Sequence, residues 1–497
     1  MRGGLILAID QGTTNTKGLL IDRSGGPVYR MAIPVPLSTQ SSGLVEQDSM
    51  VLWESVLAVI AGARRYATDS GARIEAVAIS NQRETALAWD AETGKPACPA
   101  VSWQCGRGTA ICNRLAHHGD QLRATTGLPL APLISASKWA WLIENDSVVG
   151  QLAHSGNLRL GTVDAWLIYQ LTGGAVHATD LTNASRTGLL ALDTQSWSLA
   201  SLEWFGIPQK ALPSLHCSSN FFGHCTGVKG FEDVPVLAAI GDSHAALVGQ
   251  GSFSPGTVKS TYGTGSSLMA LTGSLIPDTP SLARTIAWSV AGKTQFALEG
   301  NIAMTGAAIQ WLGEFLRLSD PANDVAALAA SVSSAEGLYF VPAMVGLGAP
   351  HWDADARGAI CGLSRSHTGA HLARAALEAV AYQVADVFFA MEQEAALVFT
   401  ELRADGGATR NSSLMQFQAN ILGRPVLRSG NEELSAIGAA WVAGMELGWW
   451  RSLSDLEGLA AVADHFGPHM EQASRNRLYR GWQKAVGSIR TSPGACA

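Results

Sequence analysis

The stretch LILAIDQGTTNTKGLLID, residues 5–22, decides the fold of this chain. An apolar run at 5–9 precedes a polar turn rich in Gly and Thr, and a second apolar run follows at 18–21, which is the pattern of a β-hairpin. The turn gathers backbone N–H groups, threonine hydroxyls and Lys17 beside the carboxylate of Asp10. Such a turn suits phosphate oxygens on one side and a hydrated divalent cation on the other. For this pattern alone, a solvated hairpin tip is the alternative.

The same pattern recurs near the middle of the chain. GTVKSTYGTGSSLMA, residues 256–270, again reads as strand, Gly- and Thr-rich turn and strand. Shortly before it, the apolar run VLAAIGD (236–242) ends in a carboxylate. Two phosphate-binding hairpins predict two similar halves that face each other across a bound nucleotide.

The segment 252–259 connects that carboxylate to the second hairpin, and we place the domain boundary there. The prediction is an N-terminal domain at 1–251, with the substrate and the first phosphate hairpin, and a C-terminal domain at 252–497 that binds the nucleotide. Apolar β runs alternate with helical patterns along both parts, which is typical of α/β organisation. The β runs lie at 76–80 and 337–342, and the helical patterns at 50–67, 307–316, 371–395 and 413–422.

Composition restricts the class of protein. The 497 residues are 47% hydrophobic and 15% charged, and the net charge is −7 with Lys and Arg dispersed, so nucleic acid is not an expected partner. Seven cysteines without a C-x-x-C pair argue against a disulfide scaffold or a zinc site and favour a reducing compartment. We find no secretory leader and no uninterrupted apolar stretch of about 18 residues, and we therefore expect a cytoplasmic protein without a membrane span.

Further motifs extend over nearly the whole chain. They are NQRET (81–85), WQC (103–105), GTVDAWL (161–167), TNASRT (182–187), ALEG (297–300), GLGAP (346–350), DGGA (405–408) and a C-terminal signature at 362–378. With the two hairpins, these motifs resemble the FGGY family of carbohydrate kinases, and within it most closely the glycerol kinases. The resemblance implies two actin-like (ribonuclease H-like) α/β domains with the active site in the cleft between them. It also implies transfer of the γ-phosphoryl group of ATP to a hydroxyl of a polyol or sugar, with Mg²⁺, by a homo-oligomer, expected to be a dimer.

The family pattern assigns catalytic and nucleotide-binding roles. Asp242 matches the catalytic base, since an alcohol needs a carboxylate within hydrogen-bond reach to accept its proton as phosphorus is attacked; a strand-end cap is the alternative. Asp10 and Asp242 match the carboxylates that hold the hydrated cation. Lys17 stands where glycerol kinases commonly have arginine, which keeps the charge and loses bidentate geometry. The ATP contacts fall on Thr13, Thr14, Lys17, Thr264, Gly306, Gln310, Gly407 and Asn411.

The acceptor side has both matches and departures. Arg83 and Glu84 match a donor and an acceptor that clamp neighbouring hydroxyls, and their adjacency requires a bend or a strand end. Trp103 matches an apolar wall, with core packing as its alternative. Three pocket positions depart from the glycerol kinase pattern, namely Leu133 in place of tyrosine, Ser243 in place of glutamine and Ser267 in place of phenylalanine. His244 either binds a substrate hydroxyl or carbonyl, or points into the following helix.

The departures predict a wider and more polar pocket. We therefore expect a polyol or ketose larger than glycerol, of four or five carbons, as the acceptor. Glycerol itself is the alternative acceptor, and a non-catalytic sugar sensor is the remote alternative. The segment CTGVKGFED (225–233) lacks the Gly-rich basic loop of glycerol kinases that fructose bisphosphate inhibits, and we do not expect that inhibition here.

Overall fold

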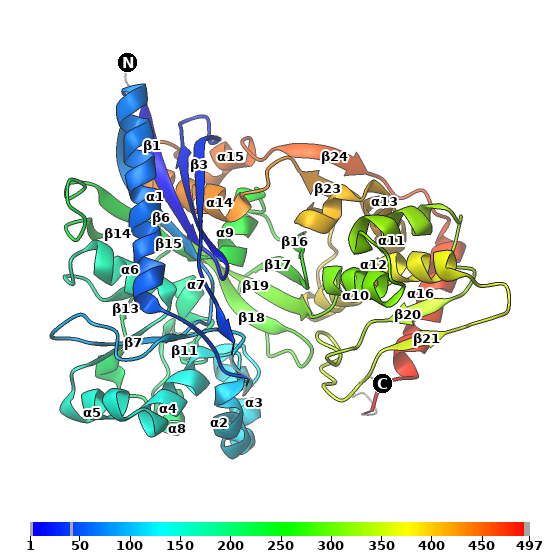
Figure 1. Ribbon diagram of the computed structural model, residues 1–497, viewed down its shortest axis with the longest axis horizontal. Helices are drawn as coiled ribbons and strands as arrows, with labels where there is room; N and C mark the ends of the chain where they lie inside the picture. Colours follow the sequence, from blue (N-terminus) through cyan, green and yellow to red (C-terminus); the bar gives the residue numbers. More distant parts are fainter. Residues whose placement is uncertain (1–2, 40–42, 492–497) are drawn as a thin grey trace.

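The structure is a computed structural model that describes residues 3–39 and 43–491. Two large β-sheets, one from each half of the chain, are surrounded by helices (Figure 1). The first sheet has the strand order β14-β15-β6-β1-β2-β3, and the second has the order β18-β19-β17-β16-β22-β23-β24. The predicted α/β organisation is confirmed. The residues of the two predicted domains at 1–2, 40–42 and 492–497 lie outside the described part.

The two sheets repeat one plan. In each, a hairpin is followed by parallel strands: β1 pairs antiparallel with β2 and parallel with β6, just as β16 pairs antiparallel with β17 and parallel with β22. The predicted pair of similar halves is therefore confirmed. The first sheet consists of β1 (Gly4–Gln11), β2 (Asn15–Ile21), β3 (Pro27–Pro34), β6 (Arg73–Asn81), β14 (Ser219–His224) and β15 (Pro235–Gly241). The second consists of β16 (Thr257–Tyr262), β17 (Ser266–Gly273), β18 (Ala283–Val290), β19 (Lys293–Ile302), β22 (Glu401–Asp405), β23 (Val426–Ser429) and β24 (Val462–Phe466).

Both hairpins form where the sequence predicts them. In the first, Asp10 lies opposite Lys17, and a three-residue turn follows Gln11. In the second, Tyr262 lies opposite Ser266 across the turn 263–265. In each hairpin, the Gly- and Thr-rich turn lies at the ends of two strands inside its sheet.

The predicted helices also form. They are α1 (Ser49–Ser70), α10 (Gly306–Phe315), α12 (Gly369–Ala395) and α13 (Ser412–Leu422). Helix α1 begins because the Asp48 carboxylate accepts the backbone N–H groups of Met50 and Val51, and it ends at Gly71 in the left-handed region. With α6 (Val163–Leu171), α1 packs on one face of the first sheet. The outer core of the second sheet is completed by α12, α13, α11 (Pro321–Ala330) and α16 (Gln472–Gly487).

Two helices join the halves. Helix α9 (Asp242–Gly249) follows the first sheet, and α14 (Leu434–Glu446) follows β23 of the second. They cross closely at glycines, since a Cβ on Gly438 would lie 1.8 Å from the Ala245 carbonyl oxygen. Helix α14 returns to the first sheet, where Ile437 and Trp441 share one buried core with Ile6 and Ala78. The division into 1–251 and 252–497 stays a prediction.

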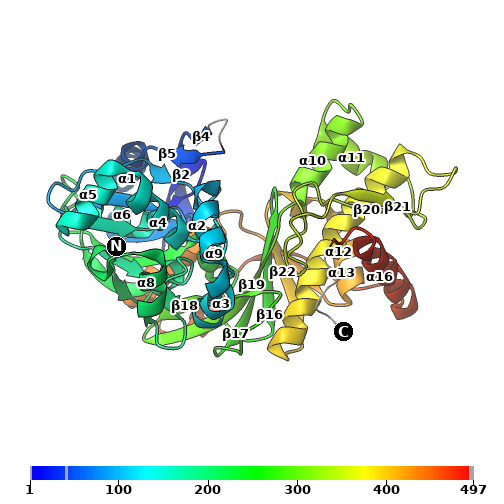
Figure 2. The same cartoon turned by 90° about the horizontal axis from the view of Figure 1, so that it is seen from below.

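A helical layer extends the first half below its sheet. Helices α2 (Thr109–Arg114), α3 (Gly119–Thr126), α4 (Ser135–Asn145), α5 (Ser147–Ser155) and α8 (Leu199–Phe205) lie there, and short α7 (Leu181–Ala184) lies closer to the sheet (Figure 1). Figure 2 shows β19 between α9 on one side and α12 on the other. The edge strand of the second sheet, β18, is anchored on the first half, because the backbone N–H of Arg284 donates to the Gly127 carbonyl at 2.9 Å.

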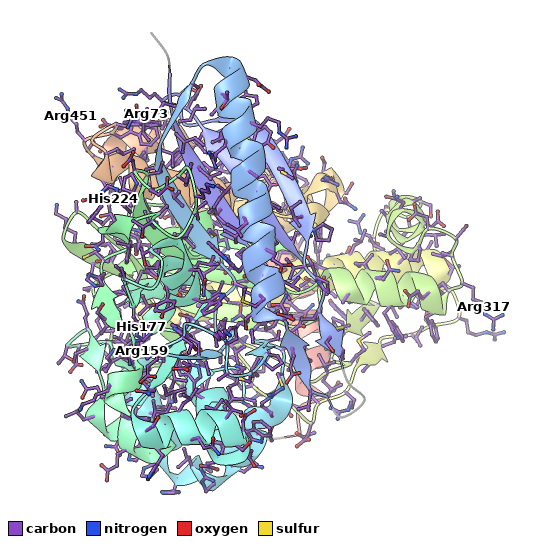
Figure 3. All side chains as sticks on the ribbon, turned by 60° about the vertical axis from the view of Figure 1, so that its left-hand side comes forward. Arg73, Arg159, His177, His224, Arg317 and Arg451 are labelled. Carbon is purple, nitrogen blue, oxygen red and sulfur yellow. The ribbon has the colours of Figure 1, made fainter. Side chains whose placement is uncertain are left out.

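Basic side chains are spread over the surface. Arg73 and Arg451 lie near one end of the first half, Arg159 lies lower on it, and Arg317 lies at the far tip of the second half (Figure 3). Within residues 3–39 and 43–491, no helix combines the length and the apolar character needed to cross a membrane.

Candidate active site

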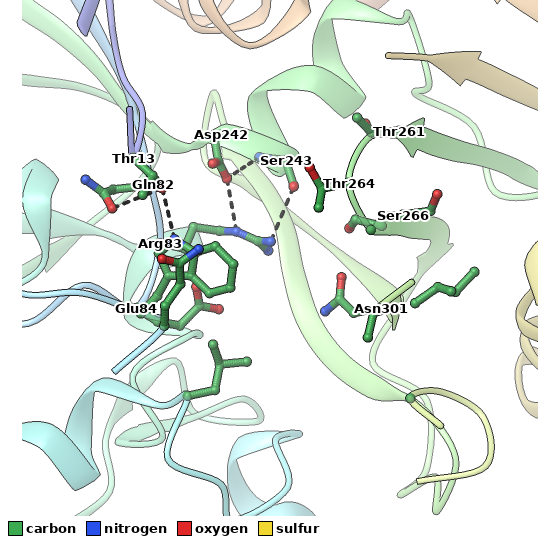
Figure 4. Close-up of a pocket in the computed structure, with 18 of the residues that line it drawn as sticks. Thr13, Gln82, Arg83, Glu84, Asp242, Ser243, Thr261, Thr264, Ser266 and Asn301 are labelled. Atoms are coloured by element: carbon green, nitrogen blue, oxygen red, sulfur yellow. Dashed lines mark hydrogen bonds and ion pairs between the residues drawn. The ribbon is translucent and has the colours of Figure 1, made fainter. Parts of the chain in front are cut away.

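A cavity of about 720 Å³ lies between the two halves (Figure 4). One wall comes from the first half, at the carboxyl ends of its parallel strands, and the other comes from the turn of the second hairpin and the end of β19. Nine of the residues predicted for the site line this cavity: Thr13, Arg83, Glu84, Trp103, Leu133, Asp242, Ser243, Thr264 and Ser267. The structure therefore brings both predicted hairpins and the predicted acceptor clamp to one place.

Asp242 lies at the point where β15 ends and α9 begins. Its Oδ1 accepts the backbone N–H of Ser243 at 2.7 Å and lies 3.1 Å from Nε of Arg83. Burial raises the pKa of the Asp242 carboxyl, while the Arg83 guanidinium and the Ser243 N–H act in the opposite direction. The side chain is still 37% exposed, toward the cavity. It is therefore a carboxylate that can meet an acceptor hydroxyl.

A buried polar network fixes the strand ends that carry these groups. The Asp180 carboxylate accepts the Thr182 hydroxyl at 2.8 Å, and that hydroxyl oxygen accepts the Gly241 N–H at 2.9 Å, directly before Asp242. Asn183 exchanges two side-chain hydrogen bonds with Asn81, at 2.9 and 3.1 Å, at the end of β6. The network therefore holds the ends of β6 and β15 in register, and with them Arg83 and Asp242.

The acceptor clamp requires a sharp bend. Strand β6 ends at Asn81, and Glu84 has a left-handed backbone with φ of 61°. This bend allows the adjacent side chains of Arg83 and Glu84 to line the same cavity. Glu84 is buried and accepts from Nε of Arg186 at 2.6 Å. The bend that the sequence requires is confirmed.

The aromatic wall is also in place. Trp103 is 37% exposed and lines the cavity, so it is not a core residue. Its indole N–H donates to the Thr13 hydroxyl at 2.9 Å, which ties the wall to the first hairpin turn.

The three departures from the glycerol kinase pattern line the cavity together. Leu133 contributes an apolar side chain beside the clamp. The Ser243 hydroxyl accepts from Nη2 of Arg83 at 3.3 Å, and the Ser267 hydroxyl donates to Oε1 of Glu299 at 3.4 Å. Ser243 and Ser267 therefore contact charged groups at the clamp, and they also leave space in the cavity.

His244 does not line the cavity. It is fully buried, and its Nε2 lies 3.3 Å from the Thr285 hydroxyl on β18. Burial and the neighbouring Arg83 hold the pKa of the imidazole well below its usual range, so His244 is neutral. The side chain takes neither of the two orientations that the sequence leaves open, because it does not line the cavity and its ring contacts β18 instead of the following helix.

Four predicted ATP-binding residues of the second half do not line the cavity. The Gly306 N–H donates to the Gly263 carbonyl at 3.0 Å, and a Cβ at 306 would lie 2.5 Å from that oxygen, which excludes other residues. Gln310, one turn further along α10, donates to Glu314 at 2.8 Å. Gly407 follows β22, with open space where a Cβ would point, and Asn411 caps α13.

Thr14 and Lys17 belong to the first hairpin and also lie outside the cavity lining. The Thr14 hydroxyl accepts from the Asn15 side chain at 3.1 Å. Nζ of Lys17 lies 2.6 Å from the Glu433 carboxylate, directly before α14, and Arg30 contacts the same carboxylate. In this structure Lys17 is therefore paired within the protein.

Asp10 is the second carboxylate of the predicted metal site. It accepts the Ser80 hydroxyl at 3.0 Å, and burial, with a contribution from the charge of Asp242, raises its pKa to about 6. Two neighbouring carboxylates at strand ends fit Mg²⁺, which takes one or two carboxylates together with water and phosphate oxygens. Within the described part of the chain there is no cluster of three or more His, Cys, Asp or Glu side chains suited to a metal.

The structure adds residues that the sequence did not single out. Gln82, Gln104, Arg186, Asn301 and Trp352 line the cavity. Asn301 lies opposite Ser267 across β17 and β19, and Trp352 has a left-handed backbone with φ of 49°. Arg186 belongs to the TNASRT motif and Trp352 follows GLGAP, so the signal lay in or beside motifs already noted.

Comparison with known proteins agrees with this geometry. The sequence matches the FGGY family of carbohydrate kinases, N-terminal domain, over residues 5–249 and the C-terminal domain of the same family over residues 258–447. Glycerol kinase from Symbiobacterium thermophilum is 42% identical over 495 residues, which cover 98% of each chain. Plasmodium falciparum glycerol kinase, solved with ADP, has a TM-score of 0.94 and 30% identity, covering 99% of each chain. Gluconate kinase from Lactobacillus acidophilus shares the fold, with a TM-score of 0.90, 23% identity and 99% of each chain covered.

This duplicated α/β architecture, with its cavity between two phosphate-type hairpins, is that of a phosphotransferase with an actin-like fold. The chain belongs to the FGGY family of carbohydrate kinases. It is an ATP-dependent kinase with an alcohol group as the acceptor.

Proposed function

We propose that this chain transfers the γ-phosphoryl group of ATP to a hydroxyl of glycerol, with a longer acyclic polyol or a ketose as the second candidate acceptor. The proposal rests on one observation above all: Asp242, Arg83 and Glu84 line one cavity together with Thr264 of the second hairpin. A carboxylate, a hydroxyl clamp and a phosphate-type turn are the groups that phosphoryl transfer to an alcohol needs.

Each group has a role in this proposal. Arg83 donates to one acceptor hydroxyl and Glu84 accepts from its neighbour, which aims a hydroxyl at Asp242. Asp242 takes the proton of that hydroxyl as its oxygen bonds to phosphorus. The turns that contain Thr13 and Thr264 offer N–H and hydroxyl donors to phosphate oxygens. The other predicted contacts, Thr14, Lys17, Gly306, Gln310, Gly407 and Asn411, remain proposed ATP ligands, and Lys17 must exchange Glu433 for phosphate to become one.

We propose Asp10 and Asp242 as the carboxylates that hold Mg²⁺. When bound, the cation neutralises charge on the phosphate oxygens. The homo-oligomeric state, the cytoplasmic location and the absence of fructose bisphosphate inhibition remain predictions.

Different observations favour each of the two candidate acceptors. Two of the three similar proteins named above are glycerol kinases, which favours glycerol. The small side chains of Leu133, Ser243 and Ser267, with Asn301 beside them, favour a longer acceptor because they leave room and polar groups beyond a three-carbon chain.

A panel of acceptors decides between them. Purified protein with ATP and Mg²⁺ is assayed on glycerol, tetritols, pentitols and pentuloses, and kcat/KM is compared. A preference for glycerol over every longer acceptor supports the first candidate, and a preference of tenfold or more for a four- or five-carbon acceptor replaces it by the second. No turnover of any member contradicts the proposed function.

The raised pKa of Asp10 leads to a pH prediction. Because the folded-state pKa, about 6, lies above the ordinary aspartate value of 3.8, the native state binds the proton more tightly than the unfolded chain, and the free energy of unfolding falls as pH rises from about 4 to 6. Asp10→Asn therefore raises the free energy of unfolding at pH 8 by about 3 kcal/mol, with a smaller gain at pH 5, and it abolishes Mg²⁺-dependent activity.

Urea unfolding at both pH values measures this effect. Asp69→Asn, on the exposed side of α1, is the control and changes stability at neither pH. An Asp10→Asn protein that is less stable than the wild type at pH 8 would contradict the prediction.

A further inference from the structure

Glu299 is a fully buried carboxylate that reaches from the second half of the chain to the acceptor clamp of the first. It lies on β19, between Met269 of β17 and Ala283 of β18, so its backbone is held in the middle of three strands. Its side chain does not line the cavity. It lies behind the cavity wall, against the groups that do.

The Glu299 carboxylate joins two arginines. Nη1 of Arg83 donates to its Oε1 at 2.8 Å, and Nη1 of Arg186 forms an ion pair with its Oε2 at 2.8 Å. Both guanidiniums are nearly buried, with 10% and 3% of their side-chain surface exposed. Burial raises the pKa of Glu299, but the two guanidiniums outweigh it and hold the pKa well below its usual range.

Both arms of the clamp depend on this carboxylate. With Nη1 on Glu299, the guanidinium of Arg83 keeps Nε beside Asp242 and Nη2 beside Ser243. The second arginine, Arg186, holds Glu84 through its Nε at 2.6 Å. A single side chain thus sets the directions of the donor arm and of the acceptor arm.

The strand next to the one that carries Glu299 is anchored on the first half. Thr285 of β18, next to β19 in the sheet, bonds to the Ser185 hydroxyl at 2.8 Å, one residue before Arg186. The Ser267 hydroxyl, which lines the cavity on β17, also donates to Glu299. The second sheet and the clamp therefore meet at one carboxylate at the base of the cavity.

We propose that Glu299 is a positioning residue, contributed by the second half, that sets the geometry of the Arg83 and Glu84 clamp for the acceptor hydroxyls. The inference rests on the proposed function, since it concerns the acceptor site. Without its charge, the Arg83 guanidinium is released toward Asp242, and Arg186 no longer fixes Glu84.

Glu299→Gln tests this role, because glutamine has the same shape and lacks the charge. We expect kcat/KM for the best acceptor of the panel to fall about 10²-fold, mostly through a higher acceptor KM, as for a small misplacement of the reacting groups. The KM for ATP stays within twofold, because no predicted ATP ligand contacts Glu299. Glu299→Asp, which keeps the charge on a shorter stem, recovers part of the loss.

The control is Glu378→Gln. Glu378 is another buried carboxylate of the second half, and it bonds to Arg374 at 2.7 Å outside the cavity. This variant loses a buried charge in the same way and leaves the acceptor KM unchanged. Melting temperatures of all variants report their folding, and if the glutamine variant at 299 does not fold, the Glu299→Asp protein is measured in its place.

The outcomes separate the two proposals. A folded Glu299 variant with wild-type acceptor KM and kcat, or with equal losses toward ATP and the acceptor, overturns the positioning role and leaves the proposed function intact. If the wild type phosphorylates no acceptor of the panel, the proposed function fails and the inference fails with it.

Discussion

Asp242→Asn lowers kcat by about 10²–10⁴, the loss expected when a general base is removed. The asparagine keeps the size and the contact with the Ser243 N–H, but it cannot take the proton of an acceptor hydroxyl. The fold and the binding of ATP without Mg²⁺ are retained, because the predicted ATP contacts lie on other residues and the network of Asp180 and Thr182 holds the preceding Gly241. Steady-state kinetics and a nucleotide-binding titration measure the two effects.

Asp233→Asn is the matched control, since Asp233 is an exposed carboxylate of the same half, and its kcat equals that of the wild type. The kcat of the wild type also falls with decreasing pH, as Asp242 takes up a proton. Because burial raises the pKa of Asp242, this fall begins at a higher pH than for an exposed aspartate. Turnover of the asparagine variant within tenfold of the wild type at neutral pH would remove Asp242 from the role.

Leu133→Tyr combined with Ser267→Phe shifts acceptor preference toward glycerol. Each added ring fills space that the cavity now leaves open. A difference of this size in an apolar contact discriminates between two substrates by about 10–200-fold. The two rings together therefore change the ratio of kcat/KM for glycerol to that for a pentitol by about 10²–10⁴. The measurement is that ratio in the double variant and in the wild type.

Ser267→Ala separates the added ring from the lost hydroxyl. The Ser267 hydroxyl donates to Glu299, so part of any effect at this position arises from the clamp and not from cavity volume. We expect the alanine variant to change the ratio by less than tenfold. An unchanged ratio in the double variant would contradict the role of these positions in specificity.

Local patterns predicted the parts of the fold that local forces determine. Both hairpins and the helices at 50–67 and 371–395 follow from runs of apolar residues, from turns rich in Gly and Thr and from helical spacing, all of which act within a few residues. The placement of α14 on the first sheet could not be predicted in this way, because its partners in β1 and β6 lie more than 350 positions earlier in the chain.

The same limit applies to the site. The carboxylate of Asp242 and the pair Arg83 and Glu84 were predicted because they belong to recognisable motifs. The partners of these groups were not, because Glu299 is 216 positions from Arg83 and only the folded chain brings them together. Lys17 illustrates the converse: its place in the first hairpin predicts a phosphate contact, but its present partner, Glu433, lies 416 positions away.

The return of α14 to the first sheet affects how the chain is made. Its apolar side covers a face of that sheet to which Ile6, Ala78 and Ile240 contribute, yet residues 250–433 separate it from α9 along the chain. At about 5–20 residues per second, a ribosome needs about 10–40 s to add that segment. During this interval the first sheet is complete in its strands but lacks its last helix. A nascent chain interrupted before residue 434 therefore presents an uncovered apolar surface, which chaperones can bind and through which neighbouring nascent chains can associate.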